Sequence, residues 1–247
     1  MHSALEHLDH RPWQMPRRPW IWRQSWCDLL FAHWRVPASV LRSRVPRELV
    51  IQEREGSGWV GVVPFRMSGV SPRPFPDFPG LSSFPEINVR TYVEMDGRPG
   101  VWFFSLDATS PIAVRVARWF FHLPYFRASI DTNTSESGIG YRVGRRPEGP
   151  RFEATYREEG PEFCADPGTL DHWLTERYCL YAQNRRGAIF RTDVHHRPWA
   201  LQRALCEIRR NELLEGIGID PLHPDHVLFS RGVDVVLWSP QRAGDRS

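Results

Sequence analysis

The chain has 247 residues and a formal net charge of +3 at pH 7, with 41% hydrophobic and 25% charged residues. These values are ordinary for a soluble globular protein. All 32 residues of the Lys+Arg count are arginines, so the chain has no lysine. The absence of lysine excludes an enzyme that forms a Schiff base on a lysine of its own chain.

Several other classes of protein are also disfavoured. The arginines occur in isolated pairs such as Arg185-Arg186, not in the basic stripe of a nucleic-acid-binding surface. The four cysteines lack C-x-x-C spacing, and no P-loop, G-x-S-x-G or dinucleotide-binding motif is present. No apolar run has the length of a membrane span, and the first residues lack an apolar signal core. We therefore expect a cytoplasmic protein with no metal, cofactor, nucleic-acid partner or membrane partner.

The first third of the chain predicts an N-terminal arm and then strands. Residues 1–16 are polar and are expected to form a loose arm, followed by a single domain over residues 17–240 and a tail over residues 241–247. The pattern predicts a strand at 29–35, a short helix at 36–42, and a hairpin that joins 50–53 to 59–67.

Residues 64–85 are rich in proline and phenylalanine. Because proline cannot donate a hydrogen bond to a neighbouring strand, this segment is expected to be a long, stiff loop. Such a loop can be a lid over a site or a plug that covers a sheet edge, and the sequence leaves both open.

Residues 84–127 form the stretch around which the rest of the chain is expected to fold. Asp96-Gly97 is typical of a tight hairpin turn. An even-length loop there would pair Tyr92 with Val101, Arg90 with Phe103, Asn88 with Ser105 and Glu86 with Asp107. An odd-length loop would shift the pairing and separate Glu86 from Asp107. Alternation along the strand places Glu86, Asn88, Arg90 and Tyr92 on one face.

The second strand of this hairpin contains the sequence VWFFSL at Val101–Leu106, which is apolar on both faces. A strand that is covered on both sides implies that the polar face of its neighbour is covered too. Because covered polar groups need partners, we expect this face to line a cavity that holds water or a polar ligand. The alternatives are a buried ion-pair network or an ordinary solvated sheet face. If Glu86 faces Asp107, the pair of carboxyl groups is an acid/base candidate.

Ser110-Pro111 is a helix start, and the helix is expected to run to about Leu123, before Pro124. Arg115, Arg118 and His122 fall on one polar stripe of this helix. The stripe is either solvated or close enough to the hairpin for Arg118 to reach Glu86 or Asp107.

The remainder of the chain is rich in predicted strands. We expect strands at 141–145, 151–156, 178–182, 188–194 and 227–238, a helix at 169–176, a strand at 199–208 and a short helix at 211–215. His195, His196, His223 and His226 lie beside prolines and are expected to be surface groups, not metal ligands. The predicted fold is α+β, with an antiparallel sheet curled into a barrel-like cone around a cavity and a few short flanking helices.

Several motifs resemble those of the YqjF-like proteins, a bacterial family of unknown function within the acetoacetate decarboxylase-like superfamily. The resemblance covers about residues 20–240. It rests on Trp26-x-x-Leu29-Leu30-Phe31-Ala32-His33-Trp34, Leu41-Arg42-x-x-Val45-Pro46, Pro85-Glu86-x-Asn88-x-Arg90-Thr91-Tyr92-Val93, Leu123-Pro124-Tyr125 and Leu174-Thr175-Glu176-Arg177-Tyr178. It implies a sheet curled into a cone around a cavity, often in a homo-oligomer.

The resemblance also implies which decarboxylase residues are missing. Acetoacetate decarboxylases form a Schiff base on a lysine, and the matching lysine pair falls on Tyr125 and Phe126 in this sequence. One pocket glutamate of those enzymes matches Glu86. A second pocket glutamate falls near Val60 and a pocket arginine falls near Cys27, and neither residue type is kept. Decarboxylation by imine chemistry is therefore not expected.

Three hypotheses follow for the function. The first is a protein that binds a small polar metabolite, a carboxylate or a carbonyl compound, with Arg90 and Arg118 as anion clamps. The second is a lyase or hydratase that uses Glu86 as general base, assisted by Tyr125 or His122. The third is a structural or stress-related oligomer with a vestigial cavity. The candidate ligand-binding residues are Glu86, Asn88, Arg90, Tyr92, Asp107, Arg118, His122 and Tyr125, with Glu86 as the candidate catalytic residue.

Overall fold

The computed structural model describes residues 3–76 and 82–244. The strands are β1 (Trp22–Val36), β2 (Val50–Ile51), β3 (Gly58–Pro72), β4 (Phe84–Met95), β5 (Arg98–Ala108), β6 (Tyr125–Ser135), β7 (Gly138–Arg145), β8 (Arg151–Phe163), β9 (Cys179–Gln183), β10 (Ile189–His196), β11 (Leu201–Asn211), β12 (His226–Leu237) and β13 (Gln241–Arg242). The helices are α1 (Ala38–Arg42), α2 (Pro111–Phe120) and α3 (Leu170–Thr175), with 3-10 turns η1 (Ser3–Glu6) and η2 (Glu212–Leu214).

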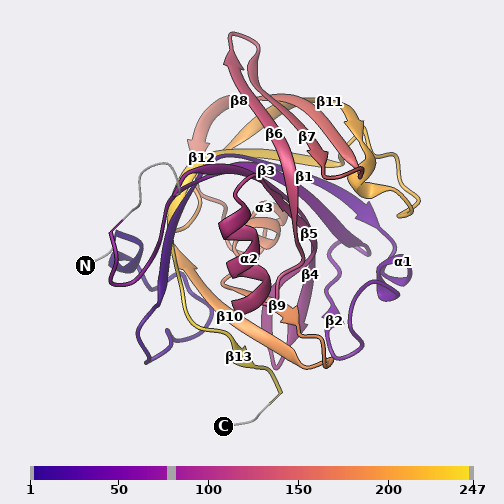
Figure 1. Cartoon of the computed structure of the whole chain (residues 1–247). Helices are drawn as coiled ribbons and strands as arrows, with labels where there is room; N and C mark the ends of the chain where they lie inside the picture. Colours follow the sequence, from indigo (N-terminus) through magenta and orange to yellow (C-terminus); the bar gives the residue numbers. More distant parts are fainter. Residues whose placement is uncertain (1–2, 77–81, 245–247) are drawn as a thin grey trace.

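All these strands belong to one sheet that closes on itself twice (Figure 1). Strand β5 pairs with β4 on one edge and with both β9 and β6 on the other. Strand β12 likewise pairs with β1 on one edge and with both β10 and β11 on the other. Ring 1 therefore consists of β1, β3, β4, β5, β9, β10 and β12, and ring 2 of β1, β3, β4, β5, β6, β7, β8, β11 and β12.

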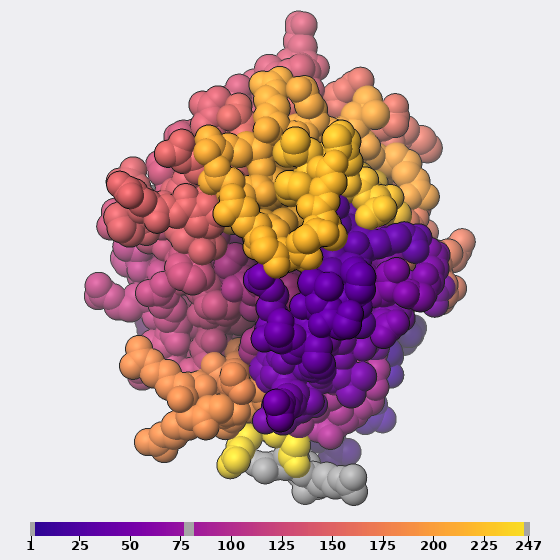
Figure 2. All heavy atoms as spheres, turned by 90° about the vertical axis from the view of Figure 1, so that its right-hand side faces the viewer, coloured from indigo at the N-terminus to yellow at the C-terminus, as the bar shows by residue number. Residues whose placement is uncertain are grey.

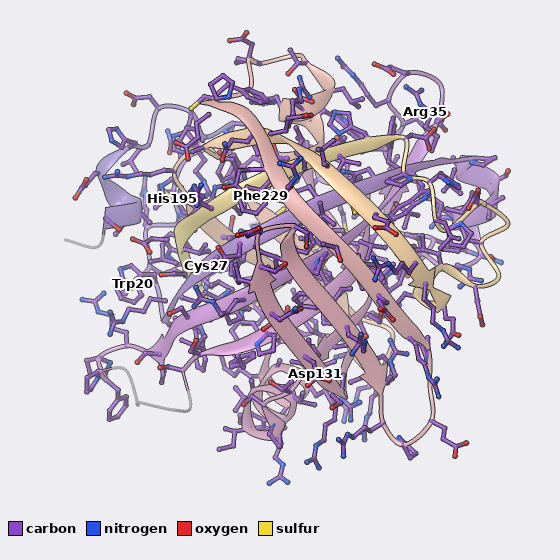
Figure 3. The ribbon with its side chains drawn as sticks, turned by 90° about the horizontal axis from the view of Figure 1, so that it is seen from above. Trp20, Cys27, Arg35, Asp131, His195 and Phe229 are labelled. Carbon is purple, nitrogen blue, oxygen red and sulfur yellow. The ribbon has the colours of Figure 1, made fainter. Side chains whose placement is uncertain are left out.

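Strands shared by the two rings are apolar on both faces because each face points into a different core. Leu29 and Phe31 belong to the core of ring 1, while their neighbour Leu30 belongs to the core of ring 2. Phe229 of β12 also packs in ring 2, and Figure 3 shows it near the middle of the molecule, with Arg35 at the edge. The predicted α+β fold with a curled, barrel-like sheet is confirmed, although β5 pairs in parallel with β6 and β9.

The β4–β5 hairpin follows the predicted register only near its turn. Tyr92 lies opposite Val101 and Arg90 opposite Phe103, as predicted. Beyond this point a β-bulge inserts one extra residue in β5, so that Glu86 lies opposite Ala108 and Asp107 lies opposite Ile87. The predicted pairing of Glu86 with Asp107 is therefore wrong, because the bulge turns the two carboxyl groups toward opposite faces of the sheet.

The two helices nearest to ring 1 begin as the sequence predicts. Ser110 caps α2 by accepting a hydrogen bond from the backbone N–H of Ala113, with Pro111 as first helical residue. Thr169 caps α3 in the same way through the N–H of His172. Figure 1 shows α2 in front of the opening of ring 1 and α3 behind it. Both helices therefore help to enclose the interior of this ring.

Two predictions for the region before β4 are wrong. Strand β2 pairs with β4 instead of β3, because residues 52–57 form a local turn with a bridge between Arg54 and Ser57. Strand β3 continues through Pro64 to Pro72, so the proline-rich loop begins later than expected. The prediction of a lid or plug includes residues 77–81, which lie outside the described residues.

Part of the N-terminal segment, around Arg11 and Trp13, packs against the domain. The Arg11 side chain is buried and forms an ion pair with Asp193 of β10 at 3.2 Å. Trp13 donates its indole N–H to the same carboxylate. His195 contacts the backbone oxygen of His7, and Figure 3 shows this segment beside His195. In the predicted tail, β13 pairs with β10.

The connection that follows α1 meets the connection between β11 and β12 at the surface. Arg44, which follows α1, donates a hydrogen bond to the carbonyl oxygen of Gly216 at 2.9 Å. Figure 2 shows the indigo region that contains α1 next to the golden region that contains residues 212–224. No helix in residues 3–76 and 82–244 has the length and apolar character needed to cross a membrane.

Candidate functional site

A cavity of about 410 Å³ lies inside ring 1. Strands of this ring form its wall, and α2 contributes one side. Most of the side chains that line it are apolar, among them Trp22, Trp26, Leu29, Phe65, Phe84, Phe103, Leu106, Phe121, Trp199 and Leu237. The charged and amide side chains are few: Gln24, Glu86, Asn88, Arg90, Arg177 and His196. Such a lining suits a ligand that is mostly apolar and carries a few polar groups.

Glu86 is the only carboxyl group among the described residues that line this cavity, and it is 1% exposed. The hydroxyl group of Tyr125, the first residue of β6, donates a hydrogen bond to Oε2 of Glu86 at 2.8 Å. Burial raises the pKa of Glu86 to about 8; the hydrogen bond from Tyr125 opposes this effect and the charge of Asp107 adds to it. At neutral pH Glu86 therefore holds a proton, and the cavity has no carboxylate charge of its own.

Arg90 and Arg177 bring positive charge to the cavity. Arg90 is half-buried and donates to the carbonyl oxygen of Leu174 at 3.5 Å. Arg177 is buried and donates to the carbonyl oxygen of Trp173 and to the amide oxygen of Gln52. Neither guanidinium forms an ion pair with a carboxylate among the described residues. Burial lowers the pKa of Arg177 to about 10, with a further lowering from the charge of Arg90, so Arg177 remains cationic at neutral pH.

The ring of Tyr92 supports both guanidinium groups. The Cζ atom of Arg90 lies 5.7 Å from the ring centroid, and that of Arg177 lies 4.9 Å from it. Tyr92 contacts both arginines but is not among the residues that line the cavity. A 2.6 Å hydrogen bond between its hydroxyl group and Nε2 of His33 fixes its position. Burial lowers the pKa of His33 well below its usual value, so this histidine is neutral.

Four residues that line the cavity carry a buried polar atom with no hydrogen-bond partner among the described residues. These atoms are Nε1 of Trp26, Oδ1 of Asn88, Nε of Arg90 and Nη2 of Arg177. The side chains of Asn88 and Arg177 are buried, with exposed fractions of 5% and 8%. Buried polar groups in native proteins almost always have partners, so these atoms favour a site for a ligand with polar groups.

Asp107 does not belong to this site. It is fully buried on the other face of β5 and accepts two hydrogen bonds from Arg145 of β7, at 2.6 and 2.8 Å. The guanidinium of Arg145 also stacks on Phe126 at 3.9 Å. The carboxylate of Asp107 is therefore occupied by a buried ion pair in ring 2.

Arg118 and His122 also lie outside the cavity. Arg118 is exposed and donates from Nε to the carbonyl oxygen of Tyr125, at 2.5 Å, with no ion pair to Glu86 or Asp107 among the described residues. His122 follows α2 with a positive φ of 56° and packs on Phe190. The polar stripe of the helix faces away from the cavity because the apolar face of α2 covers it.

The histidine pairs differ from the prediction of surface groups. His195 and His196 lie on β10 and are buried, since their strand crosses ring 1 between β9 and β12. His226 is half-buried and hydrogen-bonded to Asp171, while His223 is exposed. Within the described part of the chain, no group of three or more His, Cys, Asp or Glu side chains is arranged to hold a metal ion.

Sequence reasoning missed Arg177, His196 and Gln24. Arg177 was visible as part of the Leu174–Tyr178 motif, but nothing in that motif indicates which face of the chain the arginine occupies. It follows α3, which ends at Thr175, and the chain then enters β9 in the wall of ring 1. Sequence reasoning did place Glu86, Asn88 and Arg90 on one face, and the structure places all three at the cavity.

The fold is similar to that of solved structures from the acetoacetate decarboxylase group. Acetoacetate decarboxylase from Legionella pneumophila subsp. pneumophila str. Philadelphia 1 has a TM-score of 0.65 and 13% identity, with coverage of 96% of this chain and 93% of that chain. The enduracididine biosynthesis enzyme MppR, complexed with the condensation product of pyruvate and imidazole 4-carboxaldehyde, has a TM-score of 0.63 and 14% identity, with coverage of 93% and 92%. At these identities the likeness concerns the fold alone.

Sequence comparison identifies nearer relatives. The uncharacterized protein YqjF of Bacillus subtilis (strain 168) is 40% identical over 235 residues, which cover 94% of this chain and 97% of that protein. The model of the DUF2071 family, described as an uncharacterized conserved protein, matches residues 23–234. Together with the acetoacetate decarboxylase-like fold, these matches show that the chain belongs to the DUF2071 family.

Proposed function

We propose that the protein binds a small metabolite with a carboxylate or carbonyl group in the cavity of ring 1. The observation that carries this proposal is the charge of the cavity. Arg90 and Arg177 are two guanidinium groups without an ion pair among the described residues, and the one carboxyl group in the described lining of the cavity, Glu86, is protonated at neutral pH. Cations without an ion pair in an apolar enclosure are costly, and a bound carboxylate would offset part of this positive charge.

The arrangement of the two arginines suits an anionic group. Guanidinium groups bind carboxylates through paired N–H donors, and the stacking on Tyr92 holds both side chains in place before a ligand arrives. The amide of Asn88 would supply a neutral hydrogen bond near the anion, and the carboxyl group of Glu86 would supply another further along β4. One neighbour in fold, MppR, has been solved in complex with pyruvate, which supports a small carbonyl acid as the kind of ligand to test first.

The test is a titration of carboxylates by calorimetry, with the uncharged amide of each acid as the comparison. The wild-type protein should bind an acid and not its amide. Arg90→Gln and Arg177→Gln should each weaken acid binding by about 10- to 100-fold, because each removes a charged hydrogen bond. Arg115→Gln, on the exposed side of α2, is the matched control and should leave the affinity unchanged. Acid and amide binding equally well would contradict the proposal.

A second candidate function is a lyase or hydratase that uses Glu86 as acid and base. The supporting observation is the pKa of Glu86, about 8, beside the Tyr125 hydroxyl group. A carboxyl group with this pKa can both donate and accept a proton near neutral pH. His122 lies outside the cavity, so Tyr125 is the assisting group in this version. In heavy water, wild-type protein should exchange the proton beside a bound carbonyl group, while Glu86→Gln should bind the ligand without exchange.

A further inference from the structure

The cavity has two chemically different parts. Glu86, Asn88 and Arg90 lie along β4, and Arg177 lies just before β9. The part next to β1 and α2 is lined mostly by large apolar side chains, which include Trp22, Trp26 and Phe121, with the amide of Gln24 and the indole N–H of Trp26 as its polar groups. The indole of Trp26 stacks on Trp199 with an interplanar angle of 14°, and the ring of Trp22 meets Phe121 edge to face. Flat aromatic surfaces therefore border part of the cavity.

The size of the cavity bears on which ligand it suits. An apolar cavity of about 150 Å³ is large enough to bind benzene. The cavity of ring 1, at about 410 Å³, is more than twice as large. A keto acid of three or four carbons held by Arg90 and Arg177 would leave the aromatic part to water, which has few polar partners there. Such a ligand would leave most of the available apolar surface unused.

The spacing along β4 indicates where a second polar group of the ligand would lie. Residues 86, 88 and 90 share a face, and their Cα atoms are about 7 Å apart in succession along the strand. The Cα atoms of Glu86 and Arg90 are therefore separated by about 13 Å. A carboxylate at Arg90 and Arg177 and a hydrogen-bonding group near Glu86 would therefore belong to one extended molecule.

We infer, on the basis of the proposed function, that the ligand is an amphipathic carboxylate with a planar aromatic body. Its carboxylate binds Arg90 and Arg177, and its ring occupies the apolar part between β1 and α2. Aromatic rings are preferred there because offset and edge-to-face contacts with Trp22 and Trp26 add to the burial of apolar area. The lining of the cavity thus selects for the body of the ligand as well as for its charged end.

The experiment compares propanoate, 3-phenylpropanoate and indole-3-propanoate, which share one charged end, with indole-3-propanamide as the uncharged analogue. Binding is measured by calorimetry and by the fluorescence of the tryptophans that line the cavity. We expect 3-phenylpropanoate to bind at least about 30-fold more tightly than propanoate, and indole-3-propanoate more tightly still. Ala113→Phe and Ala117→Phe fill the apolar part from α2 and should remove this advantage, while both variants still bind propanoate.

The outcomes separate this inference from the proposed function. Equal affinities for propanoate and the two aryl acids would overturn the inference and leave the proposed function intact. Binding of indole-3-propanamide as tightly as the acid would overturn the proposed role of the arginines. If none of the three acids binds, both proposals fail. If the variants of α2 weaken propanoate and the aryl acids equally, the aromatic body does not lie beside α2 and the inference fails.

Discussion

The carboxyl group of Glu86 should make the stability of the protein depend on pH, and Glu86→Gln should remove that dependence. The pKa of Glu86 is about 8 in the folded protein, against an ordinary value of 4.5. The folded state therefore keeps a proton that the unfolded chain releases. This contribution to stability is fully present below pH 4.5 and is lost as the pH rises through 8. The difference between these pKa values corresponds to about 5 kcal/mol.

Urea denaturation of both proteins at several pH values measures this effect. Between about pH 5.5 and about pH 8.5, the wild-type protein should lose about 3 kcal/mol of unfolding free energy relative to Glu86→Gln. As a control, Glu136→Gln replaces an exposed glutamate in the turn between β6 and β7, and its unfolding free energy should change with pH as that of the wild type does. The reasoning is refuted if Glu86→Gln and the wild type change in parallel, because Glu86 would then be ionised in the folded protein.

Three further substitutions test other parts of the structure. Asp193→Asn removes the buried partner of Arg11, so it should lower the free energy of unfolding by about 3 kcal/mol or more and expose the N-terminal segment to protease. Glu6→Gln, at an exposed ion pair, should lower it by less than about 1 kcal/mol, and equal effects of the two substitutions would contradict the account. Asp107→Asn should lower the urea midpoint through loss of the Arg145 pair but leave ligand affinity in titration calorimetry unchanged, and a loss of affinity would return Asp107 to the site. Ser110→Ala removes the cap of α2 and should lower the free energy of unfolding, measured by thermal denaturation, by about 1 kcal/mol. An unchanged free energy of unfolding would mean that the cap contributes nothing to stability.

Much of the fold could be predicted because local patterns carry it. The cap at Ser110 and the turn at Asp96-Gly97 are local features, and each lies where the sequence places it. The apolar run Val101–Leu106 indicated a strand covered on both sides. The double closure of the sheet explains why, since β5 is shared by the two rings. Which strands meet across the rings depends on distant pairings that local patterns do not encode.

The register of the hairpin shows where sequence reasoning ends. Period-two alternation correctly grouped Glu86, Asn88 and Arg90, because they lie on one uninterrupted strand. It failed for Asp107 because a single bulge in β5 reverses every residue beyond it. The bulge leaves no clear signal in a run of apolar residues that pack equally well on either side.

The two candidate clamps show a similar limit. Arg118 was expected at the site because its helix follows directly from the hairpin, but its side chain lies on the solvated face of α2. Arg177 occupies the position instead, although it is far from β4 in the chain. Its nearness to Arg90 follows from its position directly after α3 and from the contact of both guanidinium groups with the ring of Tyr92.

A crystal structure of the protein with 3-(4-bromophenyl)propanoate would test the central claim most directly, because the anomalous signal of bromine locates one end of the ligand independently. We predict a carboxylate bound by Arg90 and Arg177, with the bromine among the aromatic side chains beside α2. A bromine site outside ring 1, or a carboxylate that contacts neither arginine, would contradict the claim that this cavity is built to hold an anion.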